Sequence, residues 1–270
     1  MGSVVRQPAV AGYFYPSQPE TLLRDVKSYA APAMEKIRAL GCVTPHAGYM
    51  YSGHVAGAVY ARLELPRRFV ILCPNHTGAG EPLAVMSEGA WKTPLGEARI
   101  DSDLAGRLLS GFPYLSEDAS AHRSEHALEV QLPFLQALAG DFSFVPIAVG
   151  VGGYPALAAL GEALAATLAA DPEPALIIAS SDMNHYESDA VTRVKDHKAI
   201  ERILALDPRG LYDVVRSADI SMCGYGPTVA MLTGARSLGA SSAELVKYAT
   251  SADISGDKER VVGYAGVVVK

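Results

Sequence analysis

The chain has 270 residues and a mass of 28.4 kDa, with 49% hydrophobic and 19% charged residues. This composition is typical of a globular protein and excludes extended disorder. A net charge of -6, a pI near 5.6 and the lack of any Lys or Arg run argue against a nucleic-acid partner. No linker, low-complexity tract or repeat divides the chain, so we expect a single domain over residues 1–270.

The first residues contain neither a signal-peptide pattern nor an apolar span long enough for a bilayer, which predicts a cytoplasmic protein without membrane contact. Three cysteines are an odd number for such a chain, so free thiols are expected rather than disulfides. Cys42 and Cys73 lie in apolar runs typical of buried, inert thiols. Cys223 instead precedes a turn at Gly224 and a helix, whose dipole is expected to lower the thiol pKa and make Cys223 a ligand or a nucleophile.

Helical and extended patterns alternate from the N-terminus onward. Ser17 and Glu20 resemble a capping box at the start of a helix near residues 19–31. An apolar run ending at Val43 predicts the first buried strand, and residues 54–63 predict the helix that follows its loop. The same order recurs along the chain, with buried strands at 69–73, 142–150 and 175–180, a helix from about Pro155, short strands within 83–100 and two strands in 243–251 and 260–269.

The continuous apolar strands indicate a sheet that is buried on both faces. A strand with one face in water would alternate apolar and polar residues, and these runs do not. Helices between consecutive strands favour covering layers on both sides of the sheet. We therefore predict an α/β fold, a three-layer α/β/α sandwich with a central mixed β-sheet.

Polar side chains follow these strands at the points where ligands bind in open α/β sheets. His46 follows the first core strand, Asn75 and His76 follow the second, and Asp182 and His185 follow the fourth. A hydrogen-bonded loop residue is the simpler interpretation of any one of these histidines alone. Three of the chain's seven histidines at such junctions, however, favour metal binding or proton transfer, because imidazole is the commonest metal ligand and titrates near neutrality.

A polar segment at the start of an apolar helical pattern carries His122, Glu125, His126 and Glu129. The two histidines are four residues apart, as are the two glutamates, so each pair would share one face of a helix. A solvated helix face is the plain interpretation. Because His126 and Glu129 lie close to the apolar stripe, we also consider them as residues of a pocket rim.

Seven stretches of the chain resemble the Memo family in this order: RQPAVAGYFYP, TPHAGYMYSG, PNHTG, EHALEVQLPFL, SSDMNHYE, SMCGYGP and VVGYAG. The resemblance covers nearly the whole sequence. Bacterial and archaeal members are also described as component B of a three-part set with an AMMECR1-like protein and a radical SAM protein. The family is related in fold to class III extradiol dioxygenases, which implies an α/β/α sandwich with a mononuclear metal pocket at the strand ends.

Residue by residue, the resemblance implies metal ligands at His46, His76 and Cys223, with Asp182 and His185 as catalytic residues of the pocket. Extradiol enzymes hold iron(II) with two histidines and a carboxylate. A cysteine in the third position leaves iron(II) as the first expectation and also suits copper or zinc. Further residues expected to line the pocket or bind substrate are Tyr51, Asn75, His126 and Glu129.

Three functions stay open at this stage. The first is an iron- or copper-dependent, dioxygenase-like oxidoreductase of unknown substrate, with His185 as acid or base held by Asp182. The second is a non-catalytic module that binds a small molecule or a peptide in a dioxygenase-like pocket. The third is metal-free nucleophilic catalysis by Cys223 with His185 or His76 as base. Expected partners are such a ligand and the AMMECR1-like and radical SAM proteins, without nucleic acid or membrane.

Overall fold

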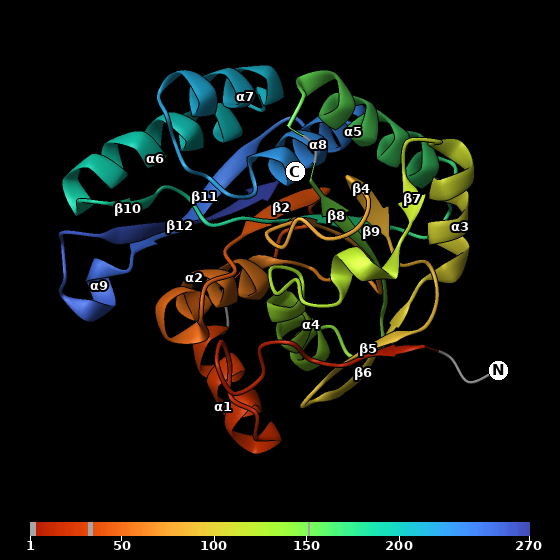
Figure 1. The fold of residues 1–270 in the computed structure, drawn as a ribbon, viewed down its shortest axis with the longest axis horizontal. Helices are drawn as coiled ribbons and strands as arrows, with labels where there is room; N and C mark the ends of the chain where they lie inside the picture. Colours follow the sequence, from red (N-terminus) through yellow and green to blue (C-terminus); the bar gives the residue numbers. More distant parts are fainter. Residues whose placement is uncertain (1–3, 32–34, 151) are drawn as a thin grey trace.

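The computed structural model describes residues 4–31, 35–150 and 152–270 (Figure 1). A mixed sheet with twelve strands in these residues runs through the molecule, and helices cover both of its faces. This arrangement confirms the predicted three-layer α/β/α sandwich.

The centre of the sheet consists of parallel strands. They pair side by side and are buried throughout, except for the half-buried first residues of two of them, Ser143 and Ala175. Their side chains alternate between the two faces. Phe69 and Ile71, for example, join one apolar cluster, while Val70 and Leu72 join the other. In sheet order these strands are β8 (Ser143–Val149), β3 (Arg68–Pro74), β9 (Ala175–Ser180) and β2 (Gly41–Thr44).

Antiparallel pairs flank this centre and make the sheet mixed, as predicted. Beside β2 lies β12 (Val261–Val269), which pairs with β11 (Ala243–Thr250) and β10 (His185–Glu187). The other flank contains β6 (Gly96–Ile100), β5 (Ala90–Thr93), β1 (Val5–Arg6), β4 (Leu83–Val85) and β7 (Ser116–Glu117).

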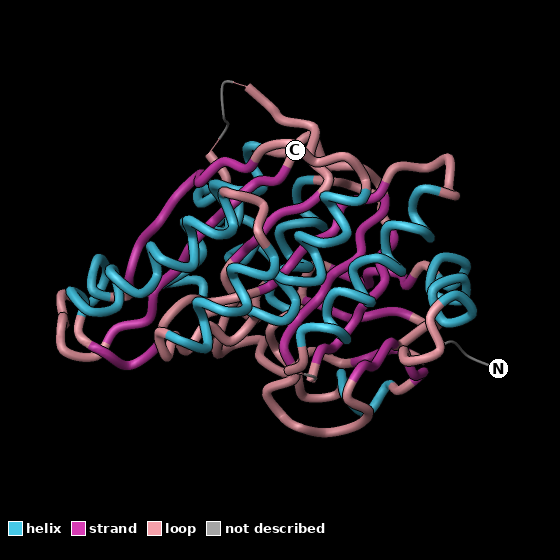
Figure 2. The backbone as a smooth tube through the Cα atoms, turned by 90° about the horizontal axis from the view of Figure 1, so that it is seen from above, coloured by secondary structure: helices cyan, strands magenta, loops and turns pink. Residues whose placement is uncertain are grey.

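The helices form two layers, one on each face of the sheet. Figure 2 looks onto the layer with more helices and shows them lying over the strands. None of the described helices is long and apolar enough to cross a lipid bilayer. The larger layer contains α3 (Ser102–Gly111), α5 (Tyr154–Ala169), α6 (Asp189–Leu204), α7 (Pro208–Ser217) and α8 (Tyr225–Ser237). The other contains α1 (Pro19–Tyr29), α2 (Tyr49–Arg62) and α4 (Leu132–Leu138), and the short α9 (Ala252–Ser255) follows β11.

Three local predictions near helix N-termini are wrong. Helix α1 begins at Pro19, as predicted, but no side chain caps it, so the expected capping box is absent. Helix α2 begins at Tyr49, five residues before the expected start. Residues 123–128 are not helical, because Pro133 occupies the first turn of α4, which is preceded only by the short 3-10 turn η2 (Glu129–Gln131).

Candidate metal centre

Three neighbouring parallel strands deliver the polar residues of the site to one edge of the sheet. His76 follows β3, Asp182 follows β9 and His46 follows β2. Strand β9 pairs with both β3 and β2, so the three loops lie side by side. Because parallel strands share one carboxyl edge, the three loops bring these residues to the same side of the sheet.

Cys223 reaches the same edge from the helical layer. It lies just before α8, whose N-cap is Gly224. A Cβ atom added to Gly224 would stand 2.4 Å from the carbonyl oxygen of Ser180 and 2.5 Å from the Cβ of Ser181. The glycine is therefore required for the loop to approach the end of β9 closely enough to bring the thiol to the histidines.

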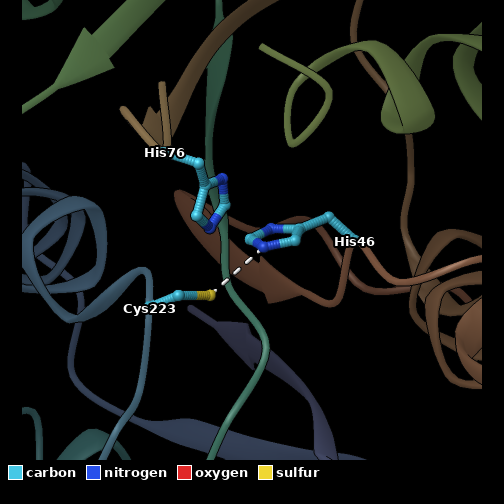
Figure 3. Close-up of side chains that lie close together, drawn as sticks. All are labelled: His46, His76 and Cys223. Atoms are coloured by element: carbon cyan, nitrogen blue, oxygen red, sulfur yellow. Dashed lines mark hydrogen bonds between the residues drawn. The ribbon is translucent and has the colours of Figure 1, made fainter. Parts of the chain in front are cut away.

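The side chains of His46, His76 and Cys223 point toward one another (Figure 3). One potential ligand atom from each lies within 4.8 Å of the other two. The Cys223 Sγ atom is 3.1 Å from Nε2 of His46, and the two imidazole rings are 5.2 Å apart at 80°. Two nitrogens and one sulfur at such separations could bind a single metal ion.

The ring of His46 is buried, and hydrogen bonds to Ser180 and Asp182 hold the residue in place. Its Nδ1 atom is 3.0 Å from the Ser180 hydroxyl, and its backbone N–H donates to Asp182 at 2.7 Å. Burial lowers the pKa of His46 well below its usual value, and the neighbouring His126 and His76 lower it further. The imidazole is therefore neutral at pH 7 and available as a ligand.

His76 is oriented by the fully buried Glu125. The carboxylate accepts the ring Nδ1–H at 2.9 Å and the His76 backbone N–H at 2.6 Å. Burial alone would lower the pKa of His76 and raise that of Glu125, but their hydrogen bond prevails and moves both pKa values the opposite way. The arrangement leaves Nε2 of His76 free on the side of Cys223, as in carboxylate–histidine–metal triads.

His185 is held by Ser221 and not, as expected from the sequence, by Asp182. Its Nδ1 atom is 2.9 Å from the Ser221 carbonyl oxygen, and its backbone N–H donates to the Ser221 hydroxyl at 2.8 Å. A carbonyl oxygen only accepts hydrogen bonds, so Nδ1 of His185 carries the proton and Nε2 is unprotonated. Asp182 instead accepts the N–H groups of His46 and Ala47, at 2.7 and 3.3 Å.

Burial governs the protonation of the two acidic groups next to His46. It raises the pKa of Asp182 to about 7, against the effect of the two backbone N–H donors. It also raises the pKa of the Cys223 thiol, and the nearby Asp182 adds to the shift. The prediction that the helix dipole lowers the pKa of Cys223 is therefore wrong for the metal-free chain, because desolvation outweighs the dipole. A cation bound beside the sulfur would favour the thiolate.

His46, His76, Asp182 and Cys223 line a cavity of about 600 Å³. His126 and His185 also line it, and the ring of His126 stacks on His76 with centroids 4.9 Å apart. The lining further includes the apolar or aromatic side chains of Phe14, Tyr186 and Val262. The cavity lining therefore combines histidines with apolar and aromatic side chains.

The structure places three residues expected at the pocket outside its lining. Glu129 is fully buried and accepts hydrogen bonds from Arg6 and Tyr15. Asn75 shapes its own turn by accepting the Gly78 N–H, and Tyr51 packs toward Val55, Ala249 and Tyr264. Spacing along the chain did not predict that Ser180, Glu125 and Ser221 orient the histidines.

The site and the fold together define a class of protein, an α/β/α sandwich with a candidate mononuclear metal centre at the carboxyl edge of its sheet. Within that class, the chain belongs to the Memo family, because a family model described as Memo-like protein matches residues 6–268. The family resemblance read from the sequence is thereby confirmed.

Curated relatives match over nearly their whole lengths. A MEMO1 family protein of Methanosarcina mazei is 45% identical over 268 residues, covering 98% of this chain and 99% of the relative. One from Methanothermobacter thermautotrophicus is 40% identical over 274 residues, covering 97% and 99%. The crystal structure of the uncharacterized protein JW3007 from Escherichia coli K12 has the same fold, with a TM-score of 0.55 and 12% identity over 84% of this chain and 99% of that chain.

Proposed function

We propose that this protein is a metal-dependent oxidoreductase whose mononuclear centre is held by His46, His76 and Cys223. The observation that carries the proposal is the convergence of two imidazole nitrogens and one thiol within 4.8 Å. Both imidazoles are also held through Nδ1, by Ser180 and by Glu125. Ligand histidines are commonly fixed in this way by a hydrogen bond to the second ring nitrogen.

Iron(II) is the proposed metal, because the family resembles class III extradiol dioxygenases in fold. Copper and zinc also suit a thiolate with two imidazoles. A bound iron or copper ion would supply one-electron redox chemistry and open positions for dioxygen or substrate. The chain's own donors fit such an ion, since two of them are imidazoles held through Nδ1 and the third is a thiol that a cation would ionise.

His185 is the proposed base. Its bare Nε2 atom can accept a proton from a substrate in the cavity, while Nδ1–H stays on the Ser221 carbonyl oxygen. Burial lowers the pKa of His185, so the imidazole is unprotonated at neutral pH. Asp182, with a pKa of about 7, is the second group placed to hold or release a proton near neutrality.

Cys223 as a metal-free nucleophile is the second candidate, because its sulfur lies 3.1 Å from a histidine nitrogen. That histidine is His46 and not the expected His185 or His76. Burial raises the pKa of the thiol, which keeps it protonated and unreactive. Slow alkylation of Cys223 by iodoacetamide in metal-free protein is the result expected from the oxidoreductase proposal, and fast alkylation would favour the nucleophile.

The cellular setting is also a proposal. We propose a cytoplasmic protein that acts on a small molecule or a peptide. The family resemblance further supports an AMMECR1-like protein and a radical SAM protein as partners. Co-purification of the three proteins from one cell extract would support this setting.

Metal analysis after anaerobic purification tests the proposed centre. The parent is expected to carry about one redox metal ion per chain, and both His46→Ala and Cys223→Ala are expected to lose it. Matched controls are His197→Ala, an exposed histidine on α6, and Cys42→Ala, a buried thiol in β2, which should retain the metal. A parent that cannot be loaded with any redox metal, or ligand variants that keep it, would contradict the proposal.

A further inference from the structure

Gln131 begins a hydrogen-bond chain behind the metal centre, at the end of η2. Its side chain is fully buried and uses all four of its hydrogen-bonding positions. The amide oxygen accepts from the hydroxyls of Thr44 at 3.0 Å and Tyr60 at 2.9 Å. The amide nitrogen donates to the Pro45 carbonyl oxygen at 2.9 Å and to Ser180 Oγ at 2.8 Å. Because a carbonyl oxygen cannot donate, the contact with Pro45 fixes which end of the amide is nitrogen.

Ser180 is the next member of this chain, at the last position of β9. Its hydroxyl lies 2.5 Å from the carbonyl oxygen of Ala127, which can only accept, so the single hydroxyl proton is used there. The remaining lone pairs accept from Gln131 and face Nδ1 of His46 at 3.0 Å. Ser180 therefore has no proton left to give to His46, and Nδ1 of His46 must be the donor.

We infer that Ser180 is a positioning residue that fixes the tautomer of His46, so that its bare Nε2 atom faces Cys223 and His76. The inference rests on the proposed metal site and goes beyond it. Ser180 does not line the cavity, and it contacts His46 at Nδ1, not at the Nε2 atom that would bind the metal. An imidazole with its proton on Nε2 cannot bind a metal ion through that atom. The serine thus selects the one neutral form of His46 that serves as a ligand.

Two-bond ¹H–¹⁵N correlation spectra of metal-free protein report directly which ring nitrogen carries the proton. The signals of His46 are identified by their loss in His46→Ala. We expect Nδ1 of His46 to be protonated in the parent. A parent with the proton on Nε2 overturns the inference, and this measurement requires neither a variant of Ser180 nor a bound metal.

Ser180→Ala is the decisive variant. Without its acceptor, the proton of His46 is expected to move to Nε2, and Zn²⁺ affinity is expected to fall about 10- to 100-fold, as for other partners of ligand histidines. Ser180→Thr keeps the hydroxyl and should retain the parent's tautomer and affinity. The matched control is Thr44→Val, which removes a buried hydroxyl from the same chain but leaves the contact between Ser180 and His46.

The outcomes separate this inference from the proposed function. Unchanged tautomer and unchanged Zn²⁺ affinity in folded Ser180→Ala would overturn the role of the serine. An equal loss of affinity in Thr44→Val would also overturn it, because the effect would then follow general loss of a buried hydrogen bond. A parent with Nδ1 protonated that binds neither Zn²⁺ nor iron would support the tautomer and contradict only the proposed function.

Discussion

Asp182 ties the stability of the metal-free site to pH. Burial raises its pKa from 3.8 to about 7, although two backbone N–H groups favour the ionised form. The unfolded chain therefore loses this proton near pH 4, whereas the folded chain keeps it up to about pH 7. The stability that the protonated group contributes is complete below about pH 4 and is lost as the pH rises toward 7.

We expect Asp182→Asn to remove this dependence, because the amide does not ionise and its oxygen still accepts from His46 and Ala47. Relative to the variant, the parent should lose up to about 4 kcal/mol of unfolding free energy between about pH 4 and pH 7. Urea denaturation in the presence of a chelator measures both proteins across this range. Parallel pH profiles would show that Asp182 is ionised throughout.

Glu125 is the residue on which the orientation of His76 depends. Glu125→Gln removes the charge that raises the pKa of His76, so the histidine should titrate at lower pH in NMR spectra of metal-free protein. Zn²⁺ affinity should fall about 10- to 100-fold, because the carboxylate orients the ligand and increases its basicity. The control is Glu117→Gln, an exposed carboxylate that accepts the Ser87 N–H and lies outside the cavity lining. Equal affinity in both variants would contradict this role.

The sequence predicted which histidines gather but not what holds them. His46 and His76 follow apolar strands and were found from strand position alone, whereas Cys223 required the family resemblance. The hydrogen bonds that hold their rings were missed because the partners are remote in the chain: Glu125 is 49 positions from His76, and Ser180 is 134 from His46. Only the packing of the elements brings such pairs together.

The turn before α8 is the element that places Cys223. Gly224→Ala puts a methyl group within 2.4 Å of the Ser180 carbonyl oxygen, so the turn must shift. We expect a stability loss of about 1–3 kcal/mol from this overpacking and a weaker metal site. Gly153→Ala is the matched control, since Gly153 is the N-cap of α5 and an added Cβ meets no atom of the described residues within 4 Å. Thermal unfolding and Zn²⁺ titration of both variants check the prediction, which equal values would contradict.

At the scale of elements, prediction succeeded where one physical signal dominated. Strands β3 and β9 were located almost to the residue, because continuous apolar runs are typical of parallel strands buried on both faces. The segment before α4 was misread because spacing of four resembles a helix, while Pro133 sets the actual start. Tyr186, with φ of 63°, gave no sequence signal for its left-handed conformation beside the cavity.

At the scale of the whole molecule, the sequence predicted layers but not which distant segments meet. Strand β1, near the N-terminus, pairs with β5 and brings Arg6 against the segment that carries Glu125. The Arg6 guanidinium donates to the Glu125 carbonyl oxygen at 2.7 Å and to the Glu129 carboxylate at 2.5 Å. The N-terminal strand thus supports, through one buried ion pair, the loop that orients His76.

A double-mutant cycle measures what this ion pair contributes. Arg6→Met and Glu129→Gln should each cost about 3–5 kcal/mol of unfolding free energy, because each leaves a buried group without its partner. The double variant should cost less than the sum, by about 0.5–3 kcal/mol, since the second change removes the group left unpaired by the first. Arg99→Met is the control, because its pair with Asp141 is exposed and should contribute within about 0.5 kcal/mol. Strict additivity in urea denaturation would mean that the two side chains do not support each other, and Arg6 would then stabilise the His76 loop through its hydrogen bond to the Glu125 carbonyl oxygen.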